Sequence, residues 1–161
     1  MTNLFRILHI YFASLLIALL PVALIMLGRM KKTKGTPAEL TVMSNLNLIG
    51  KTFGMIGGLG ILITGGALTG IEGLKWFSFS EFPWLAWKQT IFVVILIINF
   101  GIVMPASRKM TKLIDEGVAS GGIGGATDEI RALGARIGMF APLMNILGLI
   151  AMILGASKGI F

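Results

Sequence analysis

Four apolar runs, each of about twenty residues, constrain the fold of this chain more than any other feature. They cover approximately residues 7–28, 48–71, 84–104 and 136–157 of the sequence. A helix of about twenty apolar residues crosses the hydrocarbon core of a bilayer. Within that core only helices and closed barrels satisfy every backbone hydrogen bond. The pattern predicts an all-α integral membrane bundle of four transmembrane helices.

The composition supports this class and excludes several others. Hydrophobic residues make up 55% of the chain and charged residues only 13%, whereas a soluble domain carries about 25% charged residues. The 161 residues leave room for one four-helix domain, residues 1–161. Because this single domain is apolar, the sequence excludes the water-soluble classes of enzyme. No Gly-x-x-x-x-Gly-Lys-[Ser/Thr] phosphate loop occurs, which argues against nucleotide hydrolysis. The absence of cysteine excludes disulfides, thiolate metal sites and iron–sulfur clusters.

The net charge of +7 does not indicate a nucleic-acid-binding protein, because the basic residues flank the apolar runs. Basic residues in such positions set the orientation of the spans in the membrane. Most of the basic residues at span ends lie in or beside the first and third connections, namely Arg29, Lys31, Lys32, Lys34, Lys51, Arg108, Lys109, Lys112, Arg131 and Arg136. The ends of the spans on the opposite side carry only Arg6, Lys75 and Lys158. Both long connections are therefore predicted to be cytoplasmic, with both termini on the extracytoplasmic side. A bacterial cytoplasmic membrane is the expected location.

The connections between the spans are predicted to differ in character. Residues 29–47 read as a basic and then polar linker, and residues 106–135 as the longest loop, with a flexible stretch over 117–125. Pro21 is expected to kink the first span and Pro105 to end the third. The first span is too long for a typical signal peptide and ends in basic residues, so a retained span is expected.

Lys88 lies about one turn inside the third span, where a charged group costs a few kcal/mol by insertion scales. One interpretation is that its long stem lets the ammonium reach the outer headgroups. The other is that the lysine stays inside the bundle as a base or ligand. Glu72, near the outer end of the second span, is then the best candidate for a counter-charge.

His9, the only histidine, lies near the outer start of the first span. It is either an interfacial histidine bonded to a carbonyl or headgroup, or an axial ligand to haem iron or another metal. At 1.5 Å per residue, His9 and Lys88 both lie within about 10 Å of the outer boundary. If both face the interior of the bundle, they share one site.

The second span carries a row of glycines at helical spacing, namely Gly50, Gly54, Gly58, Gly66 and Gly70. Small residues four apart let membrane helices approach closely. Helix packing within the bundle is the expected role, and a smooth face for another subunit or a flat cofactor is the alternative. Asn99 and Asn145 are expected to form amide hydrogen bonds between helices.

The order of spans and a few residues resemble the HemJ/CopD-like group of small membrane proteins. The resemblance rests on Leu8-His9-Ile10, on Trp84-Leu85-Ala86-Trp87-Lys88, on the ending Lys158-Gly159-Ile160-Phe161, and on Pro142 with Asn145. The characterised relative is the HemJ-type protoporphyrinogen oxidase, in which b-type haem is implicated. The resemblance implies that His9 and Lys88 occupy that family's functional histidine and lysine positions. The chain is most similar to the uncharacterised members of the group.

These observations lead to two hypotheses. The first is a redox or haem-pathway protein with a b-type haem or metal site near the outer face, with His9 as axial ligand and Lys88 as second ligand or proton-handling group. The second is a non-catalytic accessory subunit that packs on a larger membrane complex. Besides lipid, the candidate partners are other membrane subunits or a homo-oligomer of this chain. A transporter is less favoured, because no inverted repeat or mid-membrane acidic residue is present.

Overall fold

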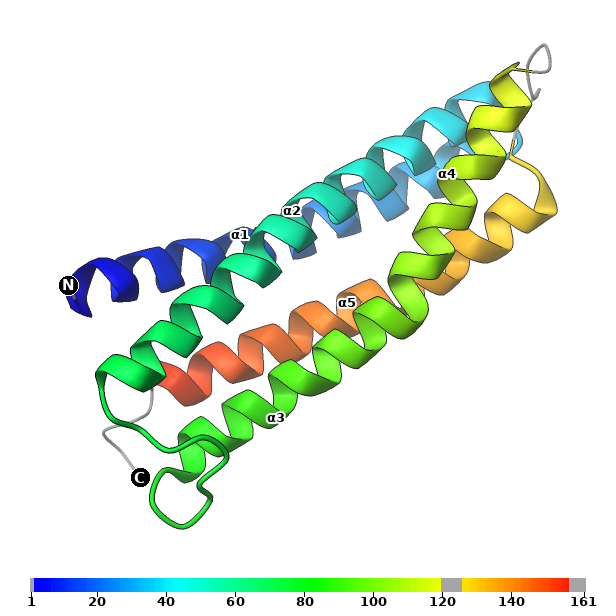
Figure 1. The fold of residues 1–161 in the computed structure, drawn as a ribbon. Coiled ribbons are helices and arrows are strands. Elements are labelled where there is room, and N and C mark those ends of the chain that lie inside the picture. Colours follow the sequence, from blue (N-terminus) through cyan, green and yellow to red (C-terminus); the bar gives the residue numbers. More distant parts are fainter. Residues whose placement is uncertain (1, 120–125, 157–161) are drawn as a thin grey trace.

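A computed structural model describes residues 2–119 and 126–156 of the chain, and the side chains of all of these except residues 118 and 119. The described chain consists of α1 (Thr2–Thr33), α2 (Pro37–Ile71), α3 (Pro83–Ile98), a π-helical turn η1 (Asn99–Val103), α4 (Met104–Ala119) and α5 (Asp128–Ala156). Figure 1 shows these helices running alongside one another as an elongated bundle. Four helical segments are long and apolar enough to cross a membrane, namely α1, α2, the continuous α3–η1–α4 and α5. The all-α, four-span prediction is confirmed at this level.

The helices extend well beyond the predicted spans. Residues 29–47 are not a linker, because α1 continues to Thr33 and α2 begins at Pro37. Pro37 suits the first turn of a helix, where a backbone N–H has no helical partner. The predicted loop 106–135 is also wrong over most of its length, since α4 and the start of α5 occupy it. Residues 120–125 of its glycine-rich stretch lie outside the described residues.

Pro105 does not end the third span, because the helix widens before it. A proline ring clashes with the carbonyl four residues earlier and cannot donate to it. Here the π-helical turn Asn99–Val103 precedes Pro105, and the Met104 N–H bonds to the Asn99 carbonyl, five residues back. A local π-turn of this kind absorbs a proline without breaking the helix. The helix α1 likewise continues through Pro21.

The helices form two closely packed pairs, α1 with α2 and α3 with α5, and α1 also packs on α5. Among the described residues, α2 and α3 do not pack extensively on each other. Instead, α4 joins the two pairs at one end by contacting both α2 and α5. The bundle is therefore closed at the α4 end and more loosely joined along its middle.

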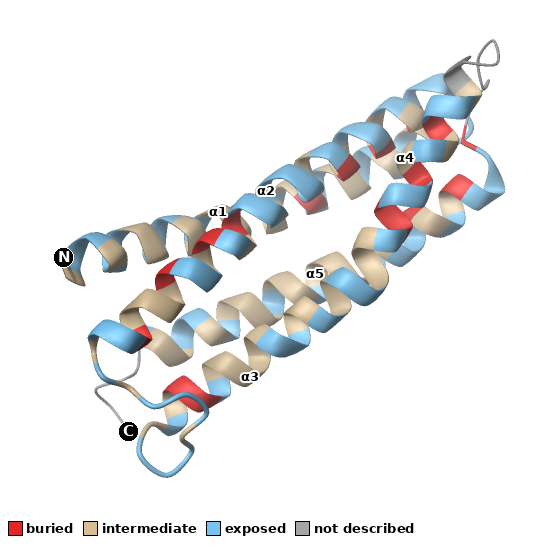
Figure 2. Ribbon diagram, viewed as in Figure 1, coloured by how far each residue is buried: buried red, intermediate tan, exposed pale blue. Residues whose placement is uncertain are grey.

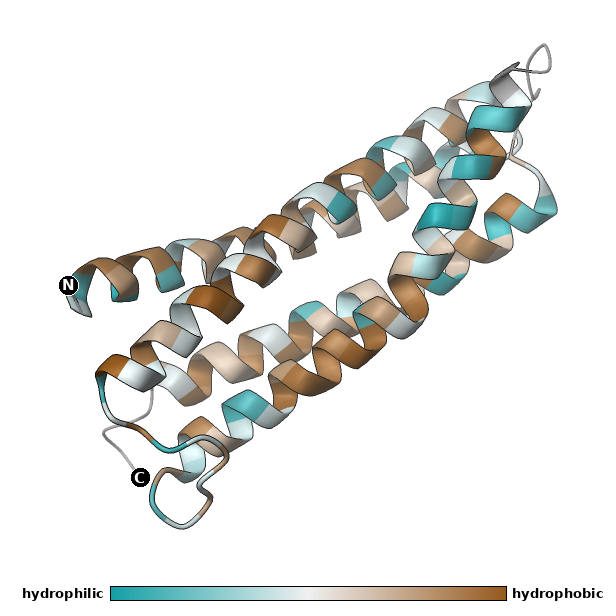
Figure 3. Ribbon diagram, in the orientation of Figure 1, coloured by the Kyte–Doolittle hydropathy of each residue, from teal (hydrophilic) through white to brown (hydrophobic). Residues whose placement is uncertain are grey.

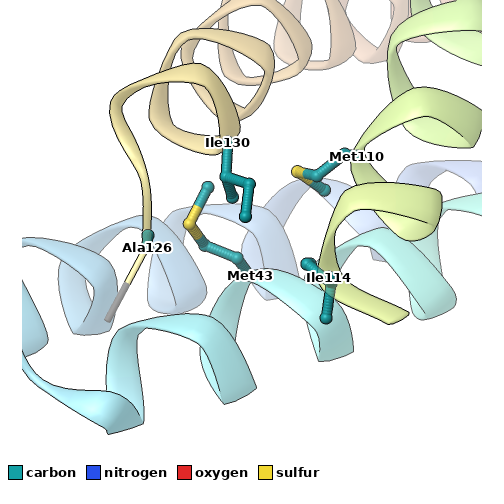
Figure 4. Packing of buried hydrophobic residues seen from close by; sticks show 5 residues of the cluster. All are labelled: Met43, Met110, Ile114, Ala126 and Ile130. Carbon is teal, nitrogen blue, oxygen red and sulfur yellow. The ribbon is translucent and has the colours of Figure 1, made fainter. Parts of the chain in front are cut away.

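A buried apolar cluster closes the α4 end. It comprises Met43, Met110, Ile114, Ala126 and Ile130, contributed by α2, α4 and the region where α5 begins (Figure 4). Met43 and Ile130 are only 1% exposed. Gly134 makes room for the cluster, because a side chain at this position would overlap the end of Met43. This end has the packing of a water-soluble domain core.

Polar contacts at the same end tie the helices together. The Glu39 carboxylate is buried and accepts hydrogen bonds from Arg131 Nε at 3.1 Å, Arg131 Nη2 at 3.0 Å and the Gly35 N–H at 2.8 Å. Asn47 donates to Thr111 Oγ1 at 2.8 Å and accepts from Ser107 Oγ at 2.5 Å. These contacts join the α1–α2 turn to α5, and α2 to α4.

The remaining length of the helices exposes large apolar side chains. Figure 2 shows that few positions along the middle of the bundle are buried, and Figure 3 shows that this region is strongly hydrophobic. Exposed examples on the four spans include Ile25, Ile63, Ile97 and Ile153. Because the surface of a water-soluble monomer rarely has so large an apolar area, this surface faces lipid. The chain is a small integral membrane protein.

Candidate functional site

His9 and Lys88 lie side by side at the end of the bundle opposite α4. The helices α1 and α2 run antiparallel through a short turn, which places His9 near the start of α1 against Thr64 near the end of α2. Lys88 lies in the second turn of α3. Its Nζ atom is 3.4 Å from His9 Nε2. Two residues that are 79 positions apart in sequence thus form a direct contact.

The imidazole of His9 is fixed by Thr64. The His9 Nδ1 atom is 2.8 Å from Thr64 Oγ1, and the Thr64 hydroxyl donates to the Gly60 carbonyl at 2.6 Å. Since a hydroxyl has one hydrogen, Thr64 Oγ1 acts as acceptor toward the ring. The Nδ1 atom then carries the ring hydrogen of a neutral His9. The Nε2 lone pair is left directed at Lys88 Nζ.

Close helix packing holds both side chains in place. A Cβ atom at Gly65 would lie 3.1 Å from His9 Cε1, so α2 approaches the ring directly. A Cβ atom at Gly155 would lie 3.0 Å from Lys88 Nζ, so α5 covers the amine. All four spanning segments therefore contribute to this site, and a side chain at either glycine would require His9 or Lys88 to shift by a few tenths of an ångström.

Glu72 lies beside a different cation from the one expected. Its Oε1 atom accepts hydrogen bonds from Arg6 Nη2 at 2.6 Å and Arg6 Nε at 3.1 Å. Arg6 precedes His9 by about one turn of α1, so this ion pair lies between the His9–Lys88 contact and the adjacent end of the bundle. The pairing of Glu72 with Lys88 stays a prediction that no contact described here supports.

Most of the predicted glycine row does not pack against another helix in this structure. A Cβ atom at Gly50, Gly54, Gly58 or Gly70 would meet no other atom within 4 Å, and one at Gly66 would meet only Trp76, at 3.8 Å. The close approach of α1 and α2 occurs instead on the adjacent face, at Gly57 against Leu16 and at Gly60 against Phe12. The sequence shows the spacing of the glycine row, but it does not show which face of α2 packs against α1.

Gly50, Gly54 and Gly58 face an apolar cavity of about 180 Å³ between the two helix pairs. Asn99 and Asn145 also line this cavity, and neither side chain forms an interhelical hydrogen bond within the part of the chain described. The expectation that these amides join helices is therefore not met in the described part of the chain, where both residues line the cavity. His9 and Lys88 do not line it.

Thr64 and the cavity were both missed by the sequence analysis. A threonine in an apolar span is inconspicuous, because its hydroxyl bonds to a carbonyl of its own helix. Its position along the chain was the one available signal, because Thr64 lies about as far from the C-terminal end of α2 as His9 lies from the start of α1.

The chain matches no family model, no curated protein and no solved structure. The resemblance to HemJ/CopD-like proteins therefore stays a prediction from the sequence.

Proposed function

We propose that this integral membrane protein has a redox or haem-linked role and that His9 is the axial ligand of a b-type haem near the outer face. The observation that carries the proposal is the contact of Thr64 with His9 Nδ1, which leaves Nε2 unprotonated with its lone pair toward Lys88. Metal-bound histidines usually donate their other ring N–H to such a partner. A bound haem would supply one-electron chemistry.

The donor atoms present fit a haem with one protein ligand better than a bare metal ion. A structural or catalytic metal ion takes three or four protein ligands. In the part of the chain that the structure describes, no three His, Asp or Glu side chains converge on such a site. Haem brings four nitrogens of its own and needs only an axial imidazole. The requirement for a single histidine agrees with a sequence that contains only one.

Lys88 fits the role of a proton-handling group better than that of a second axial ligand. The distance from His9 Nε2 to Lys88 Nζ is 3.4 Å, so the two nitrogens are in direct hydrogen-bond contact. Ligation of His9 therefore requires Lys88 to withdraw. Its ammonium would then serve as a donor beside the site.

The proposed orientation places the His9–Lys88 end outside and the α4 end in the cytoplasm. This proposal is supported by the basic residues, which gather near the α4 end, and by Trp76, Trp84 and Trp87, which lie near the other end. A bacterial cytoplasmic membrane is the proposed location.

Absorbance spectroscopy of the protein purified from haem-supplemented membranes tests the proposed ligand. We expect a Soret band that is lost in His9→Ala and retained in Lys88→Gln. We expect Thr64→Val to weaken haem binding by about 10- to 100-fold, the usual effect of removing the partner of a ligating histidine. Thr69→Val is the matched control, because the Thr69 hydroxyl donates to the Gly65 carbonyl of its own helix and, among the described residues, makes no hydrogen bond to His9. The absence of a Soret band, or an unchanged band in His9→Ala, contradicts the proposal.

The second candidate is a non-catalytic accessory subunit. It is supported by the face formed by Gly50, Gly54 and Gly58, which no other helix covers and which would admit a close-packed partner helix. Purification in a mild detergent distinguishes the two candidates. A stoichiometric membrane partner supports the accessory role, whereas migration as a monomer or homodimer argues against it.

A further inference from the structure

The cavity between the helix pairs is apolar along most of its length and cationic at one end. Its walls come from all four spanning segments, with Ala13, Leu16, Phe92 and Ile95 among the apolar lining residues. Lys51 of α2 and Arg108 of α4 also line the cavity, and its lining includes no aspartate or glutamate. The lining thus combines a hydrocarbon-like wall with two positive charges.

The two basic residues lie near the same closed end of the cavity. Asn47 and Ser107 are hydrogen-bonded to each other, and both line the cavity where α2 meets α4. Lys51 follows Asn47 by one helical turn, and Arg108 directly follows Ser107. The contact between α2 and α4 therefore brings the two cations to the same level of the bundle.

Lys51 and Arg108 differ from Lys109 and Lys112 of α4 in forming no ion pair within the described residues. On α4, Lys109 pairs with Glu129 at 2.7 Å and Lys112 lies 3.7 Å from Glu116. Within the described part of the chain, neither Lys51 nor Arg108 forms an ion pair, and both are exposed. Two cations on the wall of an apolar cavity complement an anionic group that is attached to a hydrocarbon chain.

We propose that the cavity binds one anionic phospholipid, with its phosphate at Lys51 and Arg108 and an acyl chain along the face formed by Gly50, Gly54 and Gly58. Basic pockets between membrane helices on the cytoplasmic side bind anionic headgroups in this manner. The amides of Asn99 and Asn145 line the same cavity and offer donors to the ester carbonyls of a glycerolipid. The glycines leave the space that an acyl chain needs.

This inference goes beyond the proposed function and depends on different residues. His9 and Lys88 do not line the cavity, so loss of haem binding leaves the lipid site intact. Conversely, the Lys51 and Arg108 substitutions described next leave the imidazole and its contact with Thr64 unchanged.

Native mass spectrometry of the full chain, released from nanodiscs containing equal amounts of phosphatidylglycerol and phosphatidylcholine, tests the site. We expect one retained lipid per chain, with phosphatidylglycerol favoured. The double variant Lys51→Gln/Arg108→Gln should lose most of this preference, by about five-fold for each cation removed. The control Lys31→Gln/Lys32→Gln removes the same charge from α1 residues that do not line the cavity, and it should retain the preference.

A second pair of variants tests the cavity itself. Gly54→Leu places a side chain in the space of the acyl chain, and no atom lies within 4 Å of the new Cβ. It should abolish retention of the lipid while the protein stays folded. Gly28→Leu is the matched control, since its Cβ is equally free and Gly28 does not line the cavity. Equal retention of both lipids by the native chain, unchanged preference in the Lys51/Arg108 variant, or a partner helix in place of lipid would overturn the proposal.

Discussion

Replacing Gly60 by alanine is expected to destabilise the protein strongly, whereas the same change at Gly58, two residues away, is expected to be neutral or stabilising. A Cβ atom at Gly60 would overlap the ring of Phe12 on α1, and one at Gly58 would meet no atom within 4 Å. Alanine is otherwise the better helix former by about 1 kcal/mol. Overpacking at a closely packed contact costs about 1–3 kcal/mol. The two substitutions therefore have opposite expected signs despite identical chemistry.

The midpoint of thermal unfolding in mild detergent measures this difference. The double variant Gly60→Ala/Phe12→Leu should recover part of the loss, because the smaller side chain removes the overlap. Recovery of this kind shows that the two positions are energetically coupled. A Gly60→Ala protein as stable as Gly58→Ala would show that α1 and α2 do not pack through Gly60.

Truncating Met43 to alanine is expected to cost about 2–5 kcal/mol, the range for a buried methionine replaced by alanine. Met43 is 1% exposed and lies at the centre of the cluster that joins α2, α4 and α5. Its removal leaves a void beside Ile130 and Gly134 that the rigid helices cannot fill. Because this cluster closes the α4 end, the variant should also loosen the contact between the two helix pairs.

Met139 supplies the matched control, because it is 68% exposed on the lipid-facing surface of α5. Met139→Ala should change the free energy of unfolding by well under 1 kcal/mol, since an exposed side chain leaves no cavity. Reversible unfolding of both variants in mixed detergent micelles, followed by far-ultraviolet circular dichroism, compares them directly. Equal destabilisation by the two variants would contradict a core localised at the α4 end.

The four spans could be predicted from the sequence because the bilayer imposes a length and an apolar composition on each of them. The full extent of the helices could not. Residues 37–47 and 104–119 are polar enough to read as connections, yet they are helical because they pack around Met43 and Met110. Tertiary packing of this kind overrides local composition, and only the folded chain reveals it.

The candidate site could be predicted only in part, because the sequence indicates the depth of a residue in the membrane and not the direction of its side chain. The number of residues from the end of each span predicted that His9 and Lys88 lie at one level of the membrane, and the two residues are in contact in the folded chain. The rotation of each helix about its axis decides which neighbour a side chain meets, and spacing alone does not fix it. For this reason Glu72 lies beside Arg6, and Gly50, Gly54 and Gly58 line a cavity and do not meet α1.

The tautomer of His9 is the most direct test of the central claim, that Thr64 fixes the ring and leaves Nε2 available. Because the chain contains one histidine, solid-state NMR of ¹⁵N-histidine-labelled protein in lipid bilayers reports on this residue alone. Without haem at neutral pH, we predict a neutral ring with hydrogen on Nδ1 and an unprotonated Nε2. We further predict that Thr64→Val changes the tautomer distribution. A ring that carries its hydrogen on Nε2, or one that is unaffected by Thr64→Val, would contradict the claim.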